Sequence, residues 1–487
     1  MCIRDRNNTT ARTVTIGSGG FSVSTNGTVA VGAFDAIHIL NLAGNLTVNG
    51  SLNLFTSATR AANTIISGSS VVSGAGATLT FNNLNLSPTA AITATRAITV
   101  NNNFIADVGS TTNTNQNFVV NGNFTLPNGA TYTQSANTTT FSGTTVQTIE
   151  INQGATFFGL TFSNGGVNAK TIIGDITASS TLTINAGSTV TGSGTQTLRS
   201  NATISGTCNF SGTVNWESTG NISGSTPFSI GTAVSVFSGI KTLTGGTWNV
   251  ENNLTIISGG GLILNSGTVL NNPSALNTLS VEAGGNLHMR GSNNFPTNFN
   301  TYSFATASNA RYDANLAQTI RGGITYGNLI LQQNIKTVDG SLVINGNITF
   351  SNTVSPAATL ALLNFDHTFN GSTIVNNTTA DGSITSTSGG TFRFAGADVN
   401  QTLNGSDGGT YTFHNLVFSN PGTPTALRTK AIQQNCIVNG DITIDNALGD
   451  TINLLVVNIG ANQLTKAAAS GTSVSYTHLR AHETVLD

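Results

Sequence analysis

The stretch Val48-Asn49-Gly50-Ser51-Leu52-Asn53-Leu54 contains the unit from which most of the chain is built. A short apolar strand end is followed by an Asn-Gly pair and by a second strand that alternates apolar and polar residues. The unit recurs, with substitutions, at Val120–Leu126, Ile344–Phe350 and Val438–Ile444, and in degenerate form at Val100–Phe104 and Val250–Leu254. Because Asn and Gly tolerate positive φ, each pair predicts a sharp change of chain direction.

An Asn-Gly pair between two strands ordinarily indicates a hairpin, so a sandwich built of hairpins is the alternative to consider. The strands beside these pairs are only three or four residues long, and most of the pairs are not followed by an antiparallel partner of usable length. A corner between successive faces of a coil fits this pattern better. Alternation with a period of two runs through the chain and no amphipathic helix is found, so we predict an all-β, right-handed parallel β-helix, or β-solenoid.

A longer composite repeat supports a stacked architecture. An aromatic-x-Gly or similar segment leads to a Gln-Thr-Ile or Gln-Thr-Leu strand, then to an aromatic and a Leu-containing strand, and in two copies to the Asn-Gly unit. The three copies begin at Phe141, Tyr312 and Phe394. Repeated units that cannot bury a face alone are typical of solenoids.

This order of motifs, over about residues 40 to 465, resembles the repeats of large secreted bacterial surface proteins. These are adhesin-like β-helices, often exported by type IX secretion. The resemblance implies a secreted or cell-surface protein of a bacterium, whose partners would be surface glycans or other cell-surface proteins. Its motifs are specific for architecture and weak for function, because such repeats build stalks and scaffolds more often than active sites.

Composition excludes several classes of protein. Charged residues make up 7% of the chain, hydrophobic residues 38%, and the formal net charge is −2. The hydrophobic content is enough for a core, which argues against disorder. The near-neutral balance without basic clusters gives no footprint for nucleic acid or an anionic membrane surface. No apolar run approaches the ~18 residues that a membrane span requires.

The two ends resemble translated sequencing adapters. We interpret residues 1–6 (Met1-Cys2-Ile3-Arg4-Asp5-Arg6) and 474–487, which include Ser475–Thr484, as adapter artefact, and residues 7–473 as a solenoid fragment of a longer protein. We expect one elongated domain over about Thr13 to Leu464. At ~22 residues per turn it would have ~21 turns and a length on the order of 100 Å.

The acidic residues are too dispersed to predict a catalytic or metal site. None lies between Ala36 and Ala106 or between Val108 and Ile149, whereas enzymes with a β-helix fold gather carboxylates on one face. The exception is the interval from Asp366 to Asp450, where Asp441, Asp445 and Asp450 are close in sequence, Asp366 adjoins His367, and Arg393, Arg428 and Lys430 also occur. A carbohydrate-active β-helix, a polysaccharide lyase or hydrolase, is therefore the alternative function.

The other candidate groups are expected to be structural. His38, His288 and His414 are isolated among Asn and Leu and are interpreted as surface or edge residues. Trp216, Trp248 and the many Phe residues are expected to fill the interior, although exposed aromatic rings could stack on sugars. Thr-x-Thr segments could suggest ice binding, but their copies do not recur at a fixed period.

The natural cysteines, Cys208 and Cys436, are too few for a disulfide framework and have no zinc-ligand spacing. We expect both to be reduced core residues. In all, the sequence predicts no catalytic residue, no metal ligand and no cofactor. The predicted function is a non-catalytic extracellular scaffold or adhesin segment, with a glycan-binding module as a further alternative.

Overall fold

The computed structural model describes residues 10–32, 35–75, 79–163, 169–224, 228–230, 233–351, 356–376, 382–386, 388–397, 399–405, 411–421, 428–445, 455–458 and 464–466. Both proposed adapter segments lie outside these residues. The described residues contain no helix of the length and apolar character needed to cross a bilayer.

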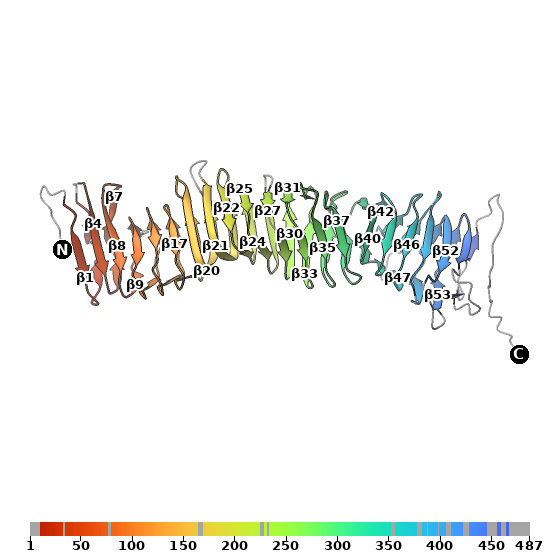
Figure 1. Ribbon diagram of the computed structural model, residues 1–487, viewed down its shortest axis with the longest axis horizontal. Helices are drawn as coiled ribbons and strands as arrows, with labels where there is room; N and C mark the ends of the chain where they lie inside the picture. Colours follow the sequence, from red (N-terminus) through yellow and green to blue (C-terminus); the bar gives the residue numbers. More distant parts are fainter. Residues whose placement is uncertain are drawn as a thin grey trace. The chain divides into compact units, whose positions relative to one another are not determined.

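The strands form a parallel β-solenoid, which confirms the predicted fold class (Figure 1). It has about 18 turns, fewer than the ~21 expected at ~22 residues per turn. The turns differ in length: 18 residues separate Gln318 from its partner Lys336 on the next turn, whereas 29 separate Gln401 from Lys430. The variation lies mainly in the connections, because the strands themselves are mostly three to five residues long.

The chain divides into two units, one formed by residues 1–235 and 246–252 and the other by residues 236–245 and 253–487. In the first unit most strands pair in parallel with the strand three positions later, as β14 (Phe104–Ile105) does with β17 (Phe124–Leu126). A short antiparallel pairing of β7 (Phe55–Ser57) with β8 (Arg60–Ile66) is an exception. The longest strands, β20 (Gln147–Phe162) and β21 (Ala169–Ile184), pair along most of a turn, with two register shifts.

The second unit has three columns of strands, one for each face of the coil. One column is β39 (Gln318–Ile320), β42 (Ile335–Val338), β45 (Thr359–Ala361), β48 (Ser383–Thr385), β51 (Tyr411–Phe413), β54 (Cys436–Val438) and β57 (Leu464–Lys466). The next is β40 (Ile324–Tyr326), β43 (Leu342–Ile344), β46 (His367–Phe369), β49 (Thr391–Phe394), β52 (Asn415–Ser419) and β55 (Ile442–Asp445). The third includes β33 (Gly260–Leu264), β36 (Asn286–Met289), β38 (Asn309–Tyr312), β41 (Asn328–Leu331), β44 (Ile348–Phe350), β47 (Thr373–Asn376), β50 (Gln401–Gly405), β53 (Arg428–Gln433) and β56 (Leu455–Asn458).

The Asn-Gly pairs are corners, as predicted, and not hairpins. Asn345-Gly346 connects β43 to β44, which belong to different columns, and Asn439-Gly440 connects β54 to β55 in the same way. The corner Asn side chains bond to the neighbouring turns: Asn370 Nδ2 donates to Asn345 Oδ1 at 2.9 Å. Such bonds between turns give a physical reason for the abundance of Asn.

The reason for glycine at these corners differs from the one predicted. Gly346 does not have a positive φ. A Cβ atom on Gly346 would instead lie 2.6 Å from the carbonyl oxygen of Thr306, closer than real Cβ contacts come. Close stacking of one corner on the turn before it, and not the φ angle, therefore requires glycine.

Replacing Gly346 with alanine is expected to destabilise the second unit by about 2 kcal/mol, because the added methyl group overpacks a corner that cannot move without breaking its hydrogen bonds. Gly17→Ala is the matched control, since nothing lies within 4 Å of the position of its Cβ atom. Amide exchange in peptides covering β43 and β44 measures the effect. Equal exchange in Gly346→Ala and in the unchanged protein would contradict it.

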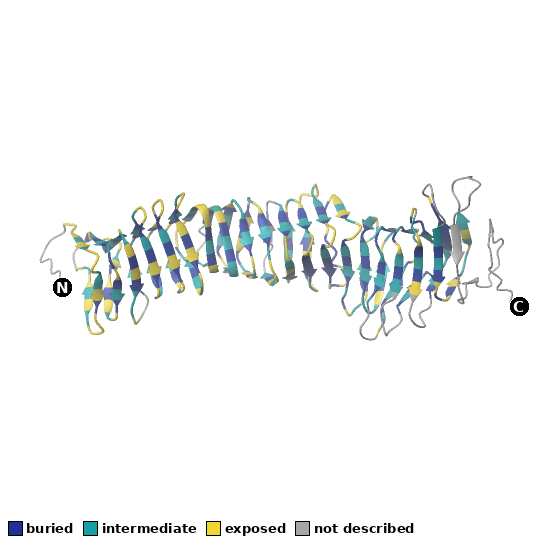
Figure 2. Cartoon of the chain, turned by 90° about the horizontal axis from the view of Figure 1, so that it is seen from below, coloured by how far each residue is buried: buried dark blue, intermediate teal, exposed yellow. Residues whose placement is uncertain are grey.

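The interior is filled by the alternate residues of each strand. Buried and more exposed residues alternate along the strands of both units (Figure 2). Aromatic rings stack between turns in the first unit: the rings of Phe104 and Phe124 lie 4.9 Å apart and nearly parallel, and those of Phe141 and Phe162 lie 5.7 Å apart. Trp216 and Trp248 are each 2% exposed, which confirms that they belong to the interior.

Candidate functional site

The interval that the sequence singles out for possible chemistry begins with Asp366 and His367, and the structure separates their roles. The Asp366 carboxylate accepts a hydrogen bond from the Thr391 backbone N–H at 2.8 Å. His367 is buried; its Nδ1 accepts from the Leu342 N–H at 3.1 Å, and its Nε2 lies 3.0 Å from the Leu362 carbonyl oxygen. Burial lowers the pKa of His367, so the neutral ring links two turns.

The remaining charged residues of this interval do not converge in the described part of the chain. Asp445 Oδ2 lies 3.3 Å from Arg393 Nη1, in a half-exposed ion pair. The Asp441 backbone N–H donates to Asn415 Oδ1 at 2.9 Å. Asp450 lies outside the described residues. Within the described ranges, no group of three or more His, Cys, Asp or Glu side chains could hold a metal ion.

Lys430, the one lysine of that interval, is fully buried and belongs to a recurrent pair that we call the Gln–Lys clamp. In each clamp a buried Gln pairs in register with a buried Lys on the next turn. The three clamps are Gln147 with Lys170, Gln318 with Lys336, and Gln401 with Lys430. Each Gln belongs to one copy of the composite repeat, so the repeat has a structural purpose.

The clamp of Gln318 and Lys336 satisfies every polar atom of the glutamine amide. Its Nε2 donates to the carbonyl oxygens of Met289 and Gly291, each at 2.8 Å. Its Oε1 accepts from the Ala314 N–H at 3.1 Å and from Lys336 Nζ at 2.6 Å. The lysine also donates to two backbone carbonyl oxygens, those of Ala314 and Leu316. The clamp therefore joins three successive turns without a carboxylate.

Burial lowers the pKa of Lys336 and of Lys430 to about 8 in each case, from an ordinary value of 10.5. Above pH 8 the folded chain therefore binds fewer protons at these lysines than the unfolded chain, and the free energy of unfolding rises with pH. Burial raises the pKa of Cys436 to about 12 and that of Cys208 well above its usual value. Thiols that ionise only in the unfolded chain therefore offset part of this rise in the free energy of unfolding.

We therefore expect the thermal midpoint to rise between pH 8 and pH 9, with Lys336 and Lys430 each adding about 1 kcal/mol to the free energy of unfolding. Thermal unfolding followed by circular dichroism at several pH values measures the rise. The double variant Lys336→Met/Lys430→Met is the control, because it removes both titrating groups. The expectation fails if the two proteins show the same slope in this window.

Sequence reasoning missed the clamps, although a signal was present. The Gln-Thr-Ile motif was recognised as part of the repeat, but the lysine follows it at a variable distance. Gln196 shows what the lysine contributes. It is also buried, but it pairs in register with Val214, and its Oε1 has no hydrogen-bond partner in the described part of the chain.

The cysteines are buried and free, as predicted. Cys208 lies in β25 (Thr207–Phe210) of the first unit, and Cys436 begins β54 of the second. Neither thiol is placed for nucleophilic chemistry, because burial keeps both in the protonated form.

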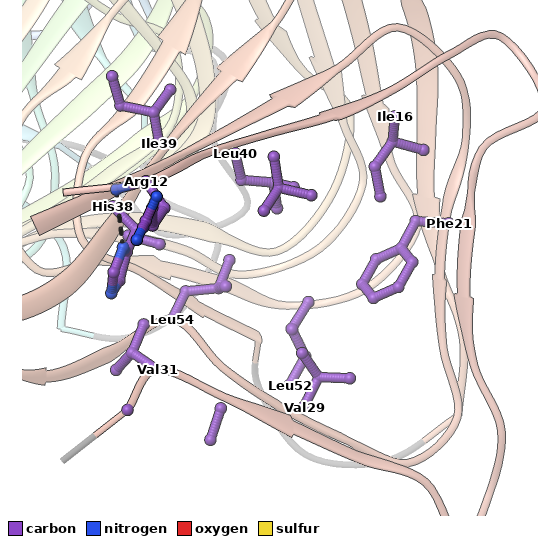
Figure 3. A pocket seen from close by; sticks show the side chains of 14 residues that line it. Arg12, Ile16, Phe21, Val29, Val31, His38, Ile39, Leu40, Leu52 and Leu54 are labelled. Carbon is purple, nitrogen blue, oxygen red and sulfur yellow. Dashed lines mark hydrogen bonds between the residues drawn. The ribbon is translucent and has the colours of Figure 1, made fainter. Parts of the chain in front are cut away.

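An apolar cavity of about 110 Å³ lies in the first turns of the first unit (Figure 3). Ile16, Phe21 and Leu52 point into it, and His38 lies at its edge, where its Nδ1 accepts from the Arg12 N–H at 3.1 Å. The strands β1 (Thr13–Ile16), β2 (Phe21–Val23) and β3 (Thr28–Ala30) each pair with one later strand. The cavity is thus the interior of these first turns. Its lining is mostly apolar and has few groups that could take part in catalysis.

A second charged cluster, which the sequence did not predict, lies in the second unit. His288 Nδ1 is 3.0 Å from Asp313 Oδ2, and Arg290 Nε is 3.3 Å from Asp313 Oδ1. The Asp313 side chain is only 6% exposed. Burial would raise the pKa of Asp313, but the hydrogen bond and charge of His288, together with Arg290, hold that pKa below its usual value.

His288 is thus not isolated, because its partner comes one turn later. The sequence predicts a surface or edge residue, and His288 does point to the outside of the coil, although it is only 9% exposed. His414, by contrast, accepts a hydrogen bond from the Gly440 N–H through its backbone carbonyl oxygen. A spacing of about one turn between a His and an Asp was the available signal.

Comparisons of the chain with family models, with curated proteins and with solved structures found no match.

Proposed function

We propose that this chain is a non-catalytic segment of a bacterial surface scaffold or adhesin, secreted or held at the cell surface. It would space or display other modules, with surface glycans or other cell-surface proteins as partners. The observation that carries the proposal is that charged side chains form hydrogen bonds within the coil. Lys336 and Lys430 bond inside the coil, and Asp366 bonds to the backbone of the next turn.

The outer surface supports the same proposal. Corner Asn side chains bond from turn to turn, as in the series Asn101, Asn121 and Ser142. Amide groups of this kind can both donate and accept, so they keep the surface hydrated without a net charge. A coil whose polar groups mainly form hydrogen bonds between its own turns is suited to a structural role.

The test is a screen for polymer breakdown, in which the full chain is incubated with neutral and acidic polysaccharides and new reducing ends are measured. No turnover is expected. Turnover that Asp445→Asn or Asp313→Asn abolishes would overturn the proposal in favour of a carbohydrate-active enzyme. A glycan array run on the same preparation would identify ligands that are bound and left intact.

A further inference from the structure

The outer face of β36, β38 and β41 carries a basic group that none of the described residues neutralises. Along β38, Ala310 and Tyr312 are buried inside the coil, so Arg311 between them points outward. In register, Arg311 lies between His288 on the preceding turn and Ile330 on the following one. We call this face the Arg311 face.

Asp313, two residues later in the chain, does not pair with Arg311, because its oxygen atoms are engaged with other side chains. Asp313 Oδ2 bonds to His288 and lies 3.4 Å from Arg290 Nη2, and Oδ1 faces Arg290 Nε. Among the described residues Arg311 has no hydrogen-bond or ion-pair partner, and its Nε atom is both buried and unsatisfied. The Asp313 carboxylate is therefore engaged with His288 and Arg290, and the Arg311 guanidinium is left without an acid among the described residues.

A row of asparagine amides runs along the same strands, two residues before Arg311 and the residues in register with it. Asn309 Nδ2 donates to Asn286 Oδ1 at 2.9 Å, and Asn328 Nδ2 donates to Asn309 Oδ1 at 3.0 Å. These bonds fix the three side chains on successive turns. Each amide NH₂ has a second proton, which can donate to a hydroxyl group of a ligand.

We propose that the Arg311 face binds a carboxylated polysaccharide, of the polyuronate class. The planar fork of a guanidinium matches the two oxygens of a carboxylate. The fixed amides offer N–H donors for sugar hydroxyls. Turns repeat every ~4.8 Å, so a polymer laid across the turns meets one asparagine of the row on each turn and Arg311 on one of them. The proposal deepens the proposed function, on which it rests, by naming the class of partner.

The experiment measures binding of the full chain to immobilised polygalacturonate, with dextran and dextran sulfate as comparison polymers. Polygalacturonate is expected to bind best. Arg311→Met should weaken that binding about tenfold, the loss expected for one charge-assisted hydrogen-bonded pair. Arg199→Met is the matched control, because it removes the same charge from an exposed residue of the first unit and should leave binding unchanged.

Arg311→Lys separates recognition of a carboxylate from general attraction, because it keeps the charge and loses the fork. We expect it to bind nearly as weakly as Arg311→Met, and binding equal to that of the unchanged protein would overturn the proposal. Equal binding to dextran, preference for dextran sulfate, or no binding at all would do the same. Reducing ends measured in the same samples keep the two conclusions apart, since turnover contradicts the scaffold proposal and loss of binding contradicts only this inference.

Discussion

Replacing Gln318 with leucine is expected to destabilise the second unit by about 3 kcal/mol, the cost of leaving a buried ammonium and buried backbone groups short of hydrogen bonds. The substitution removes the Oε1 acceptor of Lys336 and one hydrogen bond each from the Ala314 N–H and from the carbonyl oxygens of Met289 and Gly291. Amide exchange in peptides that cover β39 and β42 measures the free energy of local opening. Gln332→Leu on the outer surface is the control and should change stability by less than about 0.5 kcal/mol.

A double variant that also removes Lys336 makes this test specific for the clamp. In the double variant Gln318→Leu/Lys336→Met the buried charge is removed together with its acceptor. We therefore expect the double variant to lose clearly less stability than the sum of the two single variants, with a coupling of at least about 1 kcal/mol. Additive losses of stability would show that the two side chains contribute independently. The idea that Gln318 and Lys336 act as one unit would then be wrong.

Replacing Phe124 with alanine is expected to cost about 4 kcal/mol, the usual loss for a large aromatic side chain in a core. Phe124 is fully buried and contacts Phe104, Phe141 and Tyr132, with ring centres between 4.9 and 5.5 Å apart. The cavity would therefore disrupt contacts on three successive turns.

The same exchange measurement, now on peptides from β14 to β20, tests the prediction. Phe158→Ala is the matched control, because that ring is 38% exposed and should contribute little. Phe124→Leu should recover about half of the loss. Faster exchange confined to β17 itself would contradict the idea that the stacked rings stabilise neighbouring turns together.

The fold could be predicted because its signals are local. The alternation of strand residues and the Asn-Gly pairs lie within seven residues of one another, as in Val48 to Leu54, and a corner can be distinguished from a hairpin by the length of the flanking strands. The number of turns could not be predicted as well, since it depends on connections such as that between Gln401 and Lys430, whose length no pattern fixes.

The polar contacts were hidden for a related reason. Gln318 and Lys336, or His288 and Asp313, become neighbours only when the register of the turns is known. A lysine in a polar stretch of sequence is predicted to be exposed. It can be buried only because carbonyl oxygens accept its hydrogen bonds, and these are known only from the structure. The role of Gly346 was likewise misjudged, because a close approach between turns leaves no trace in the local sequence.

The hydrogen bonds at the corners also bear on the chemical ageing of the chain. An Asn-Gly pair can deamidate when the glycine amide nitrogen attacks the side chain of the preceding asparagine. At the corners the nitrogens of Gly122, Gly346 and Gly440 each donate to a carbonyl oxygen of the preceding turn, at 2.9, 3.0 and 2.7 Å. In the stacked coil the attacking atom is therefore held away from its target. Deamidation at these pairs requires the corner to open, so the extent of deamidation in an aged sample would report how often each corner opens.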